Sequence, residues 1–366
     1  MVGLKGRSAR WDRFAHWAPG ASALVLALSV VLLILASLTH RAQIDQVPAS
    51  SALTQAAPAS AGARDTDLAL YDVIAARVGA GENYYRVAVE EQRLRDFPVR
   101  PGLAVRLPTL ALLFAALGTL GMALLAGVLT IMMLGAWWLR LREEPGGDEH
   151  STIALLLLVI GTATGLKLEY LVLHEVWAGL LLAVSFGLYR PGRWGAAWLA
   201  AAAALAIREH ALPFVLLLGA MAAYRRDWRE CAAWGGLVLV FLIGLAVHLA
   251  QVSPLISAVD PASPPWIVWR GLGGLTSNVT LSTSLHLLPG WIAAPLVLLP
   301  LLGWAGWKSD AGLMGLLLFA GYGLLFMIAG RDNNFYWALV VTPCWFIGLA
   351  FVPRAVRSLW NSARGH

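Results

Sequence analysis

Long apolar runs are the feature that most constrains this chain. A helix needs about 20 apolar residues to cross a hydrocarbon core of roughly 30 Å, and many runs approach that length. The runs are continuously apolar rather than alternating, which favours helices over a barrel. With 59% hydrophobic and only 13% charged residues, the composition is far from that of a water-soluble domain. The sequence therefore predicts an all-α, polytopic membrane protein.

About ten transmembrane helices are expected. They fall near residues 22–40, 108–139, 152–166, 171–189, 194–207, 211–224, 232–250, 287–307, 311–329 and 336–353. Together they are expected to form a single transmembrane domain over residues 1–366, with no separate soluble domain. The two cysteines, Cys231 and Cys344, support neither a disulfide framework nor a cysteine metal site.

The distribution of basic residues predicts the orientation. If the N-terminus is cytoplasmic, most Lys and Arg residues beside the spans fall inside. The short external loops then keep only Lys167, Arg208, Arg270 and Arg331. Both termini are thus predicted to be cytoplasmic, in a bacterial inner membrane. The net charge of +6 is accounted for by arginines that face anionic membrane lipids, and the sequence shows no nucleic-acid-binding motif.

Residues 41–107 form the one long polar stretch between predicted spans and are expected to be external. An Ala-, Ser- and Pro-rich linker is predicted at 47–64. Apolar residues then recur at helical spacing on both sides of the sequence GAGEN, at Leu70, Ile74 and Val78 and again at Tyr84, Val87 and Leu94. Two short juxtamembrane helices on the membrane surface fit this pattern best.

The same stretch resembles a known enzyme family. A spanning helix is followed by an external D-x-x-x-Y helix start at Asp67 and Tyr71, by two juxtamembrane helices and by a re-entering span. This order, with DLALYDVIAARVGAGENYY as the closest stretch, resembles the GT-C glycosyltransferases, which include lipid A aminoarabinose transferases and protein O-mannosyltransferases. The resemblance implies transfer of a sugar from a polyprenyl-phosphate donor to a lipid, glycan or protein acceptor on the periplasmic face.

The resemblance assigns two catalytic acids. It places the family's catalytic acid at Asp67 and a second acidic site at Glu175. Each has a structural alternative, because a carboxylate in the first turn of a helix is also favoured by the helix dipole. For Glu175, an acid at the interfacial start of a helix is an equal interpretation.

Six residues are candidates for substrate binding. Arg208 is expected to grip the donor phosphate, with an internal pair to Glu209 as the alternative. Arg331 could hold phosphate or cap its hairpin with Asp332. The remaining candidates are Lys167, His174, Tyr71 and Tyr85; Lys167 could instead only snorkel to the interface, and His174 could be a simple interfacial histidine.

No cofactor is expected, although Asp65, Asp67 and Glu175 could together hold magnesium or manganese through oxygen. Two other classes of function compete with the enzyme. A flippase or transporter of lipid-linked glycans would favour charges midway along the spans, whereas the charges here lie at span ends. A non-enzymatic scaffold subunit would use the external helices to bind a protein partner.

Overall fold

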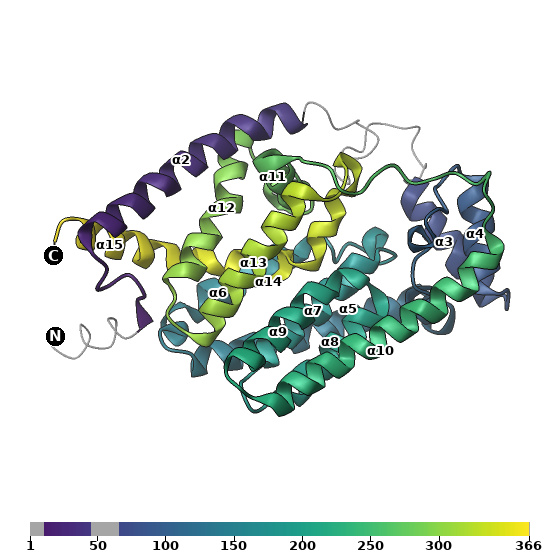
Figure 1. Cartoon of the computed structure of the whole chain (residues 1–366), viewed down its shortest axis with the longest axis horizontal. Helices are drawn as coiled ribbons and strands as arrows, with labels where there is room; N and C mark the ends of the chain where they lie inside the picture. Colours follow the sequence, from purple (N-terminus) through teal and green to yellow (C-terminus); the bar gives the residue numbers. More distant parts are fainter. Residues whose placement is uncertain (1–10, 45–65, 366) are drawn as a thin grey trace. The chain divides into compact units, whose positions relative to one another are not determined.

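The structure is a computed structural model that describes residues 11–44 and 66–365. The predicted linker at 47–64 and Asp65 lie outside the described residues. Over the described part, the chain forms helices and isolated bridges but no strand, as expected for an all-α protein. It divides into two compact units, and Figure 1 colours the chain from its N-terminus to its C-terminus.

The first unit consists of Met1–Gln55, Met133–Thr164 and Ile267–His366. Its helices are α2 (Pro19–Ile44), the end of α5 (Thr109–Glu143), α6 (Gly147–Ala163), α11 (Gly271–Leu281), α12 (Gly290–Gly306), α13 (Asp310–Ile328), α14 (Thr342–Trp345) and α15 (Val352–Ala363), with 3-10 turns η6 (Ser284–Leu287), η7 (Asp332–Val340) and η8 (Phe346–Phe351). Aromatic rings fill its core, where Trp307 stacks on Phe351 with 4.2 Å between ring centroids. Gly303 lets α12 approach η8 closely, since a Cβ there would lie 1.8 Å from the Gly348 carbonyl oxygen.

The second unit consists of Ala56–Met132 and Gly165–Trp266. It holds α3 (Thr66–Gly79), α4 (Tyr84–Leu94), η2 (Gly102–Ala104), the start of α5, η3 (Leu168–Tyr170), α7 (His174–Leu188), α8 (Gly195–Ile207), η4 (Glu209–Ala211), α9 (Leu212–Tyr224), α10 (Trp228–Val252) and η5 (Ser253–Leu255). Helices α7, α8, α9 and α10 lie side by side (Figure 1).

The two short helices predicted around GAGEN are present as α3 and α4. Asn83 ends the break between them, because its Oδ1 accepts a hydrogen bond from the Arg86 backbone N–H and so caps α4. The predicted apolar face of α3, formed by Leu70, Ile74 and Val78, is buried against α4. On α4, Tyr84 and Val87 are buried as predicted, but Leu94 is 76% exposed. Apolar spacing was therefore a sound guide to the face of α3 and a partial guide to that of α4.

The number of spans differs from the prediction. Four helical segments among the described residues are long and apolar enough to cross a membrane, or five if the pair Asp332–Val340 and Thr342–Ala363, bent by 67°, counts as one. These candidate spans fit a multi-pass membrane protein, but their number does not reach the ten spans predicted. Helices α7, α8, α9 and α12 have only 13 to 17 residues. At 1.5 Å per residue they are about 20–26 Å long, which is short of a full crossing.

Candidate functional site

Helix α3 brings two of the predicted site residues toward α7. Asp67 lies in the first turn of α3 and Tyr71 one turn later, and both are half-buried. The Tyr71 ring packs edge-on against His174, with 5.2 Å between centroids. The Tyr71 hydroxyl also accepts a hydrogen bond from Arg106 Nε at 3.4 Å. Arg106 lies just before α5 and is partly exposed, so it adds a cation that the sequence interpretation had not included.

A buried ion-pair network lies at the start of α7 and the end of α8. Arg208 Nε is 2.8 Å from Glu175 Oε1, and Arg208 Nη1 donates to Glu209 Oε1 at 2.6 Å. The side chains of Arg208 and Glu175 are 0% and 2% exposed, whereas Glu209 is 30% exposed. A buried guanidinium needs counter-charges, and the two glutamates supply them. The internal pair with Glu209, predicted as the alternative role for Arg208, is therefore present, and Glu175 belongs to it.

Histidines and a second arginine extend this network. Arg208, Arg106 and Glu209 are close enough to interact electrostatically with His174. The same three residues interact electrostatically with His210. Within the described residues, Arg208 Nη2 and His174 Nδ1 are buried without a hydrogen-bond partner. The result is a cluster of two arginines, two glutamates and two histidines beside Tyr71, with Glu209 and Arg106 at its more exposed edge.

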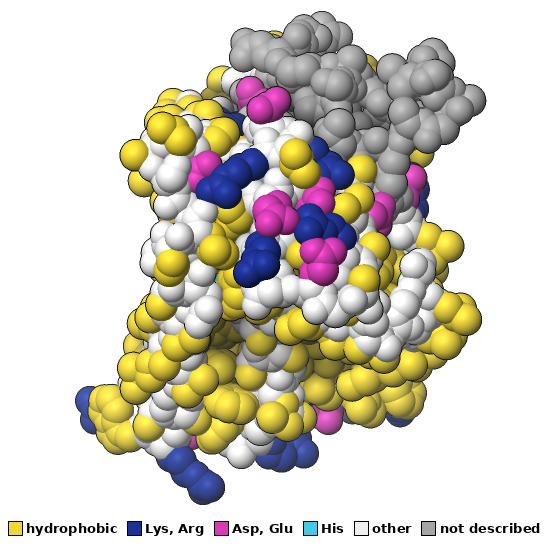
Figure 2. Space-filling model, turned by 90° about the vertical axis from the view of Figure 1, so that its right-hand side faces the viewer, with side chains coloured by type: hydrophobic (Ala, Val, Ile, Leu, Met, Phe, Trp, Pro, Cys, Tyr) yellow, Lys and Arg dark blue, Asp and Glu magenta, His cyan; other side chains and the backbone are white. Residues whose placement is uncertain are grey.

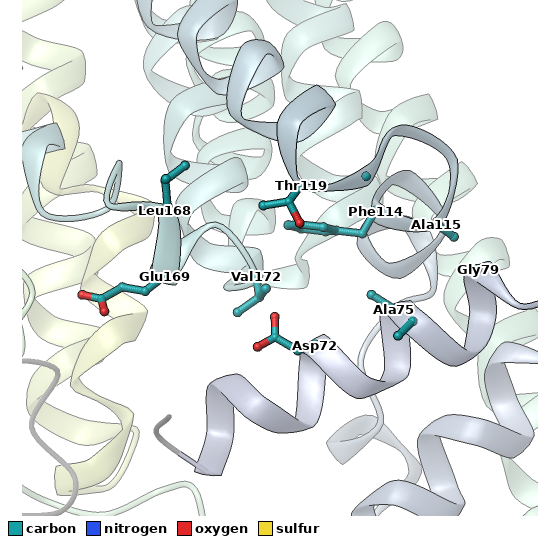
Figure 3. Close-up of a pocket in the computed structure, with 11 residues that line it drawn as sticks. Asp72, Ala75, Gly79, Phe114, Ala115, Thr119, Leu168, Glu169 and Val172 are labelled. Atoms are coloured by element: carbon teal, nitrogen blue, oxygen red, sulfur yellow. The ribbon is translucent and has the colours of Figure 1, made fainter. Parts of the chain in front are cut away.

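A pocket of about 540 Å³ opens beside α3. On α3 its lining residues are Asp72, Ala75, Ala76 and Gly79, which share one helical face by their spacing. On α5 they are Phe114, Ala115, Gly118 and Thr119, and a third wall is formed by Leu168, Glu169 and Val172. The small side chains of α3 leave the space open. Figure 3 shows the Asp72 carboxylate directed into the pocket and the Glu169 carboxylate directed away from it.

The pocket continues toward the aromatic pair described above. A smaller cavity shares Ala75, Phe114 and Val172 with it and is also lined by Tyr71 and His174. Gly118 interrupts the helical dihedrals of α5 at the pocket wall, with φ 64° and ψ 175°. This conformation favours glycine. The break gives α5 a local bend where the pocket meets an apolar, span-length helix.

Charged side chains on α3 and α4 are paired with one another. Arg77 contacts Glu82, Glu90 and Glu91, and Arg95 also contacts Glu91. Figure 2, which views the side of the molecule where α3 and α4 lie in Figure 1, shows basic and acidic side chains interspersed above an apolar surface. Burial acts to raise the pKa of Glu91, but hydrogen bonds from the two arginines outweigh it, so that pKa is lowered. These charges of α3 and α4 therefore pair with one another.

A further ion pair ties α4 to the loop after α10. Arg93 Nε is 2.7 Å from Asp260 Oδ1, and the Ser257 backbone N–H donates to Asp260 Oδ2 at 2.6 Å. The hydrogen bond from Arg93, followed by the one from Ser257, lowers the pKa of Asp260 to about 2. The carboxylate is thus held ionised and fixes the loop in place.

Three predicted binding residues lie elsewhere. Lys167 is exposed, with Nζ 5.6 Å from the centroid of the Tyr170 ring. Tyr85 packs against Tyr84 and His248 rather than lining the pocket. Arg331 belongs to the first unit, where its backbone N–H donates to Asn334 Oδ1.

The hairpin cap predicted for Arg331 involves a different acceptor. Asp332 pairs with Arg270, whose Nη2 is 2.9 Å from Asp332 Oδ1.

Within the part of the chain that the structure describes, no group of three His, Cys, Asp or Glu side chains is arranged to hold a metal ion.

Comparison of the chain with protein-family models, with curated proteins and with solved structures finds no match. The candidate site is therefore defined by its own geometry. That geometry adds two residues, Arg106 and Asp72, to those singled out from the sequence. For Asp72 the signal was present in the sequence, because Ala75, Ala76 and Gly79 follow it at helical spacing and mark a face with room beside it.

Proposed function

We propose that this chain is a membrane glycosyltransferase that moves a sugar from a polyprenyl-phosphate donor to an acceptor on the periplasmic face. One observation carries the proposal: α3 presents Asp67 and Tyr71 on one face, and Tyr71 is in contact with both Arg106 and His174. A cation is thereby placed beside Tyr71, which with His174 lines a small cavity, and the acid Asp67 lies one turn before Tyr71 on the same face of α3. The reaction needs these two kinds of group.

In the proposed reaction, Asp67 is the general base. The acceptor oxygen or nitrogen attacks the anomeric carbon, the bond from that carbon to the phosphate oxygen breaks, and the acceptor's proton passes to the Asp67 carboxylate. The departing lipid phosphate gains negative charge. Arg106, which is partly exposed, is placed to meet that phosphate.

Arg208 and Glu175 take supporting roles in this proposal. Arg208 is closed off from solvent and engaged by two glutamates, so it positions Glu209 rather than gripping the phosphate in this conformation. Glu175 holds Arg208 in place. Its assignment as a second catalytic acid gives way here to a positioning role, because its side chain is only 2% exposed.

The membrane arrangement completes the proposal. We place both termini in the cytoplasm of a bacterial cell and α3 and α4 at the external surface of the inner membrane, on the basis of the excess of basic residues in the cytoplasmic loops. In this orientation α3 begins outside the first span, and its acids face the compartment in which lipid-phosphate donors are used.

A donor-consumption assay tests the proposal. The purified chain in lipid nanodiscs is incubated with a polyprenyl-phosphate sugar, and release of polyprenyl phosphate is measured with and without a cell-envelope extract as the source of acceptor. Release that depends on Asp67 supports the enzyme. Intact donor that crosses the bilayer of proteoliposomes without release would assign the chain to transport. Absence of both activities would favour a scaffold role.

A further inference from the structure

In the second unit, a short turn joins the neighbouring helices α9 and α10 (Figure 1). Arg226 lies in this turn and Arg229 is the second residue of α10, and both are exposed. Among the described residues, neither side chain has an ion-pair or hydrogen-bond partner. An exposed guanidinium without a counter-charge is available to a ligand that carries negative charge.

The acidic residues of the turn are engaged by other groups. Glu230 is fully buried, and its carboxylate pairs with Arg225 at 3.2 Å. Asp227 caps α10, because its Oδ1 accepts a hydrogen bond from the Glu230 backbone N–H. Since Glu230 and Arg225 neutralise each other, the two exposed arginines outnumber the one remaining carboxylate of the turn. The exposed surface of the turn therefore keeps a positive charge.

Arg226 adopts a backbone conformation that costs free energy for most residues other than glycine. Its φ is 62°, in the left-handed region. Two hydrogen bonds close the end of α9 around it: the Arg226 backbone N–H donates to the Ala223 carbonyl, and the Asp227 backbone N–H donates to the Ala222 carbonyl. Glycine is the usual residue at this position of such a helix end. An arginine there indicates that its side chain has a role that outweighs the strain.

Two exposed aromatic side chains flank the arginines. Tyr224, the last residue of α9, is 89% exposed, and Trp228, the first residue of α10, is 67% exposed. Trp228 also begins a helical segment, Trp228–Leu255, that is long and apolar enough to cross a membrane. Tyr and Trp at the ends of membrane-spanning helices lie at the level of the lipid head groups. The two arginines are therefore at the depth of the lipid phosphates.

We propose that this turn binds the phosphate of an anionic membrane lipid, with Arg226 and Arg229 as its two charged ligands. A guanidinium can donate two parallel hydrogen bonds to phosphate oxygens. Tyr224 and Trp228 pack against the glycerol backbone and upper acyl chains, which a free phosphate lacks. A zwitterionic lipid is disfavoured, because its own ammonium group offsets the charge of its phosphate. This inference concerns binding alone and stands whether or not the chain transfers a sugar.

Photo-crosslinking in a lipid bilayer tests the proposal. The purified full chain is placed in phosphatidylcholine nanodiscs that contain a small fraction of phosphatidylglycerol with a diazirine near its head group, and labelled peptides are identified by mass spectrometry. Labelling is expected on the peptide that contains residues 224–229. It should be at least about tenfold stronger than with a phosphatidylcholine probe of the same design, because each arginine contributes about fivefold to the binding of an anionic lipid. Unlabelled phosphatidylglycerol should compete, and glycerol phosphate in solution should not.

Three variants locate the phosphate. Arg229→Gln should reduce labelling about fivefold at a low fraction of probe. Arg226→Gly should reduce labelling to a similar extent but leave the thermal midpoint of the protein unchanged or higher, because glycine adopts the left-handed conformation without strain. Arg86→Gln is the matched control: it also removes an exposed arginine from the first turn of a helix in the second unit, but at the start of α4, so labelling of the α9–α10 turn should persist.

Each contrary result overturns the proposal. Equal labelling by the two lipid probes, or undiminished labelling of Arg229→Gln, would leave the turn as a surface without lipid preference. An Arg226→Gly protein that is less stable than the parent and keeps full labelling would assign Arg226 to the helix end alone. Competition by glycerol phosphate would make the turn a site for soluble phosphates, and competition by a short oligonucleotide would make it a nucleic-acid site. If Arg226→Gly fails to fold, as judged by size-exclusion chromatography, Arg229→Gln and the comparison of the two probes still decide the outcome.

Discussion

Arg208 and Glu175 form an ion pair that is closed off from solvent, with Nε 2.8 Å from Oε1 and side-chain exposures of 0% and 2%. The pair joins the extended residue after α8 to the first turn of α7. Two charges removed from water at this depth are tolerable only together. The pair gives Arg208 a structural role in the second unit, while its binding to phosphate stays a prediction.

Removal of either partner of this pair should destabilise the protein strongly. Arg208→Met leaves Glu175 buried and uncompensated and should cost about 3–5 kcal/mol. Glu175→Gln leaves Arg208 paired with Glu209 alone, so it should also destabilise the protein, but by less. The temperature at which half of the protein stays monodisperse in detergent measures the loss. The variant that carries both Arg208→Met and Glu175→Gln should lose less stability than the sum of the losses of the two single variants. Lys167→Met, which removes an exposed charge, is the control, and a single variant as stable as Lys167→Met contradicts the argument.

The sequence was a good guide where one apolar face decides a helix. The apolar run that follows Asp227 predicted a helix, and the structure has α10 there. Asp227 caps this helix, because its Oδ1 accepts a hydrogen bond from the Glu230 backbone N–H. Where polar residues are buried in a helix, the sequence pattern did not predict that helix. Helix α11 contains Asn278 and Thr280, has no continuous apolar run, and went unpredicted, yet the structure buries both side chains completely or nearly so. Tertiary packing, not local pattern, fixes such a helix.

The sequence indicated candidate residues by their type but did not indicate which of them would be in contact. Asp67, Tyr71 and His174 could be singled out, but the contact between Tyr71 and His174 joins residues about a hundred positions apart along the chain. The pocket likewise depends on α3 meeting α5 at Gly79 and Ala115, where a Cβ on Gly79 would lie 3.7 Å from the Ala115 Cα. Nothing in a single sequence encodes which helices meet. It can indicate only that a face with small residues has room for a neighbour.

Arg106 should govern affinity for the lipid-phosphate donor. Arg106→Ala removes a cation beside Tyr71, and a charge-assisted hydrogen bond worth roughly 1.5–3 kcal/mol corresponds to an increase of about 10- to 100-fold in the donor KM. Arg106→Lys should recover part of this, because the charge returns without the planar fork. Arg86→Ala is the control, since it removes an exposed arginine at the start of α4. Equal effects of Arg106→Ala and Arg86→Ala would remove Arg106 from the site.

The Arg93–Asp260 pair should make stability depend on acid. Because the folded pKa of Asp260, about 2, lies below the unfolded value of about 3.9, the pair stabilises the fold fully above pH 4 and loses its contribution as the pH falls toward 2. Asp260→Asn should therefore be less stable than the parent at pH 6, and the gap should narrow at pH 2.5. Thermal midpoints of both proteins across this range provide the measurement. A gap that stays constant with pH would mean that Asp260 acts through packing alone.

Topology is checked by labelling cysteines introduced one at a time into a background that carries Cys231→Ser and Cys344→Ser. Val259 is 92% exposed and the Asp148 side chain 74% exposed, so a difference in labelling between them reports the side of the membrane rather than burial. An impermeant thiol reagent should modify Val259→Cys in intact cells and should modify Asp148→Cys only after lysis. Labelling of Asp148→Cys in intact cells would reverse the orientation and, with it, the placement of α3 outside the membrane.

Asp67→Asn is the sharpest test of the proposed chemistry. Asparagine matches aspartate in size and can still stabilise the start of α3, but it cannot take a proton, so turnover should fall by about a hundredfold or more while donor binding persists. Initial rates of polyprenyl-phosphate release at saturating donor measure this, with elution on size exclusion as the check on folding. Asp310→Asn is the matched control, because Asp310 also lies in the first turn of a helix, at the start of α13 in the other unit. Near-parental turnover of Asp67→Asn would assign Asp67 to the helix start and direct the search for a base to Asp72, the acid of α3 that lines the pocket.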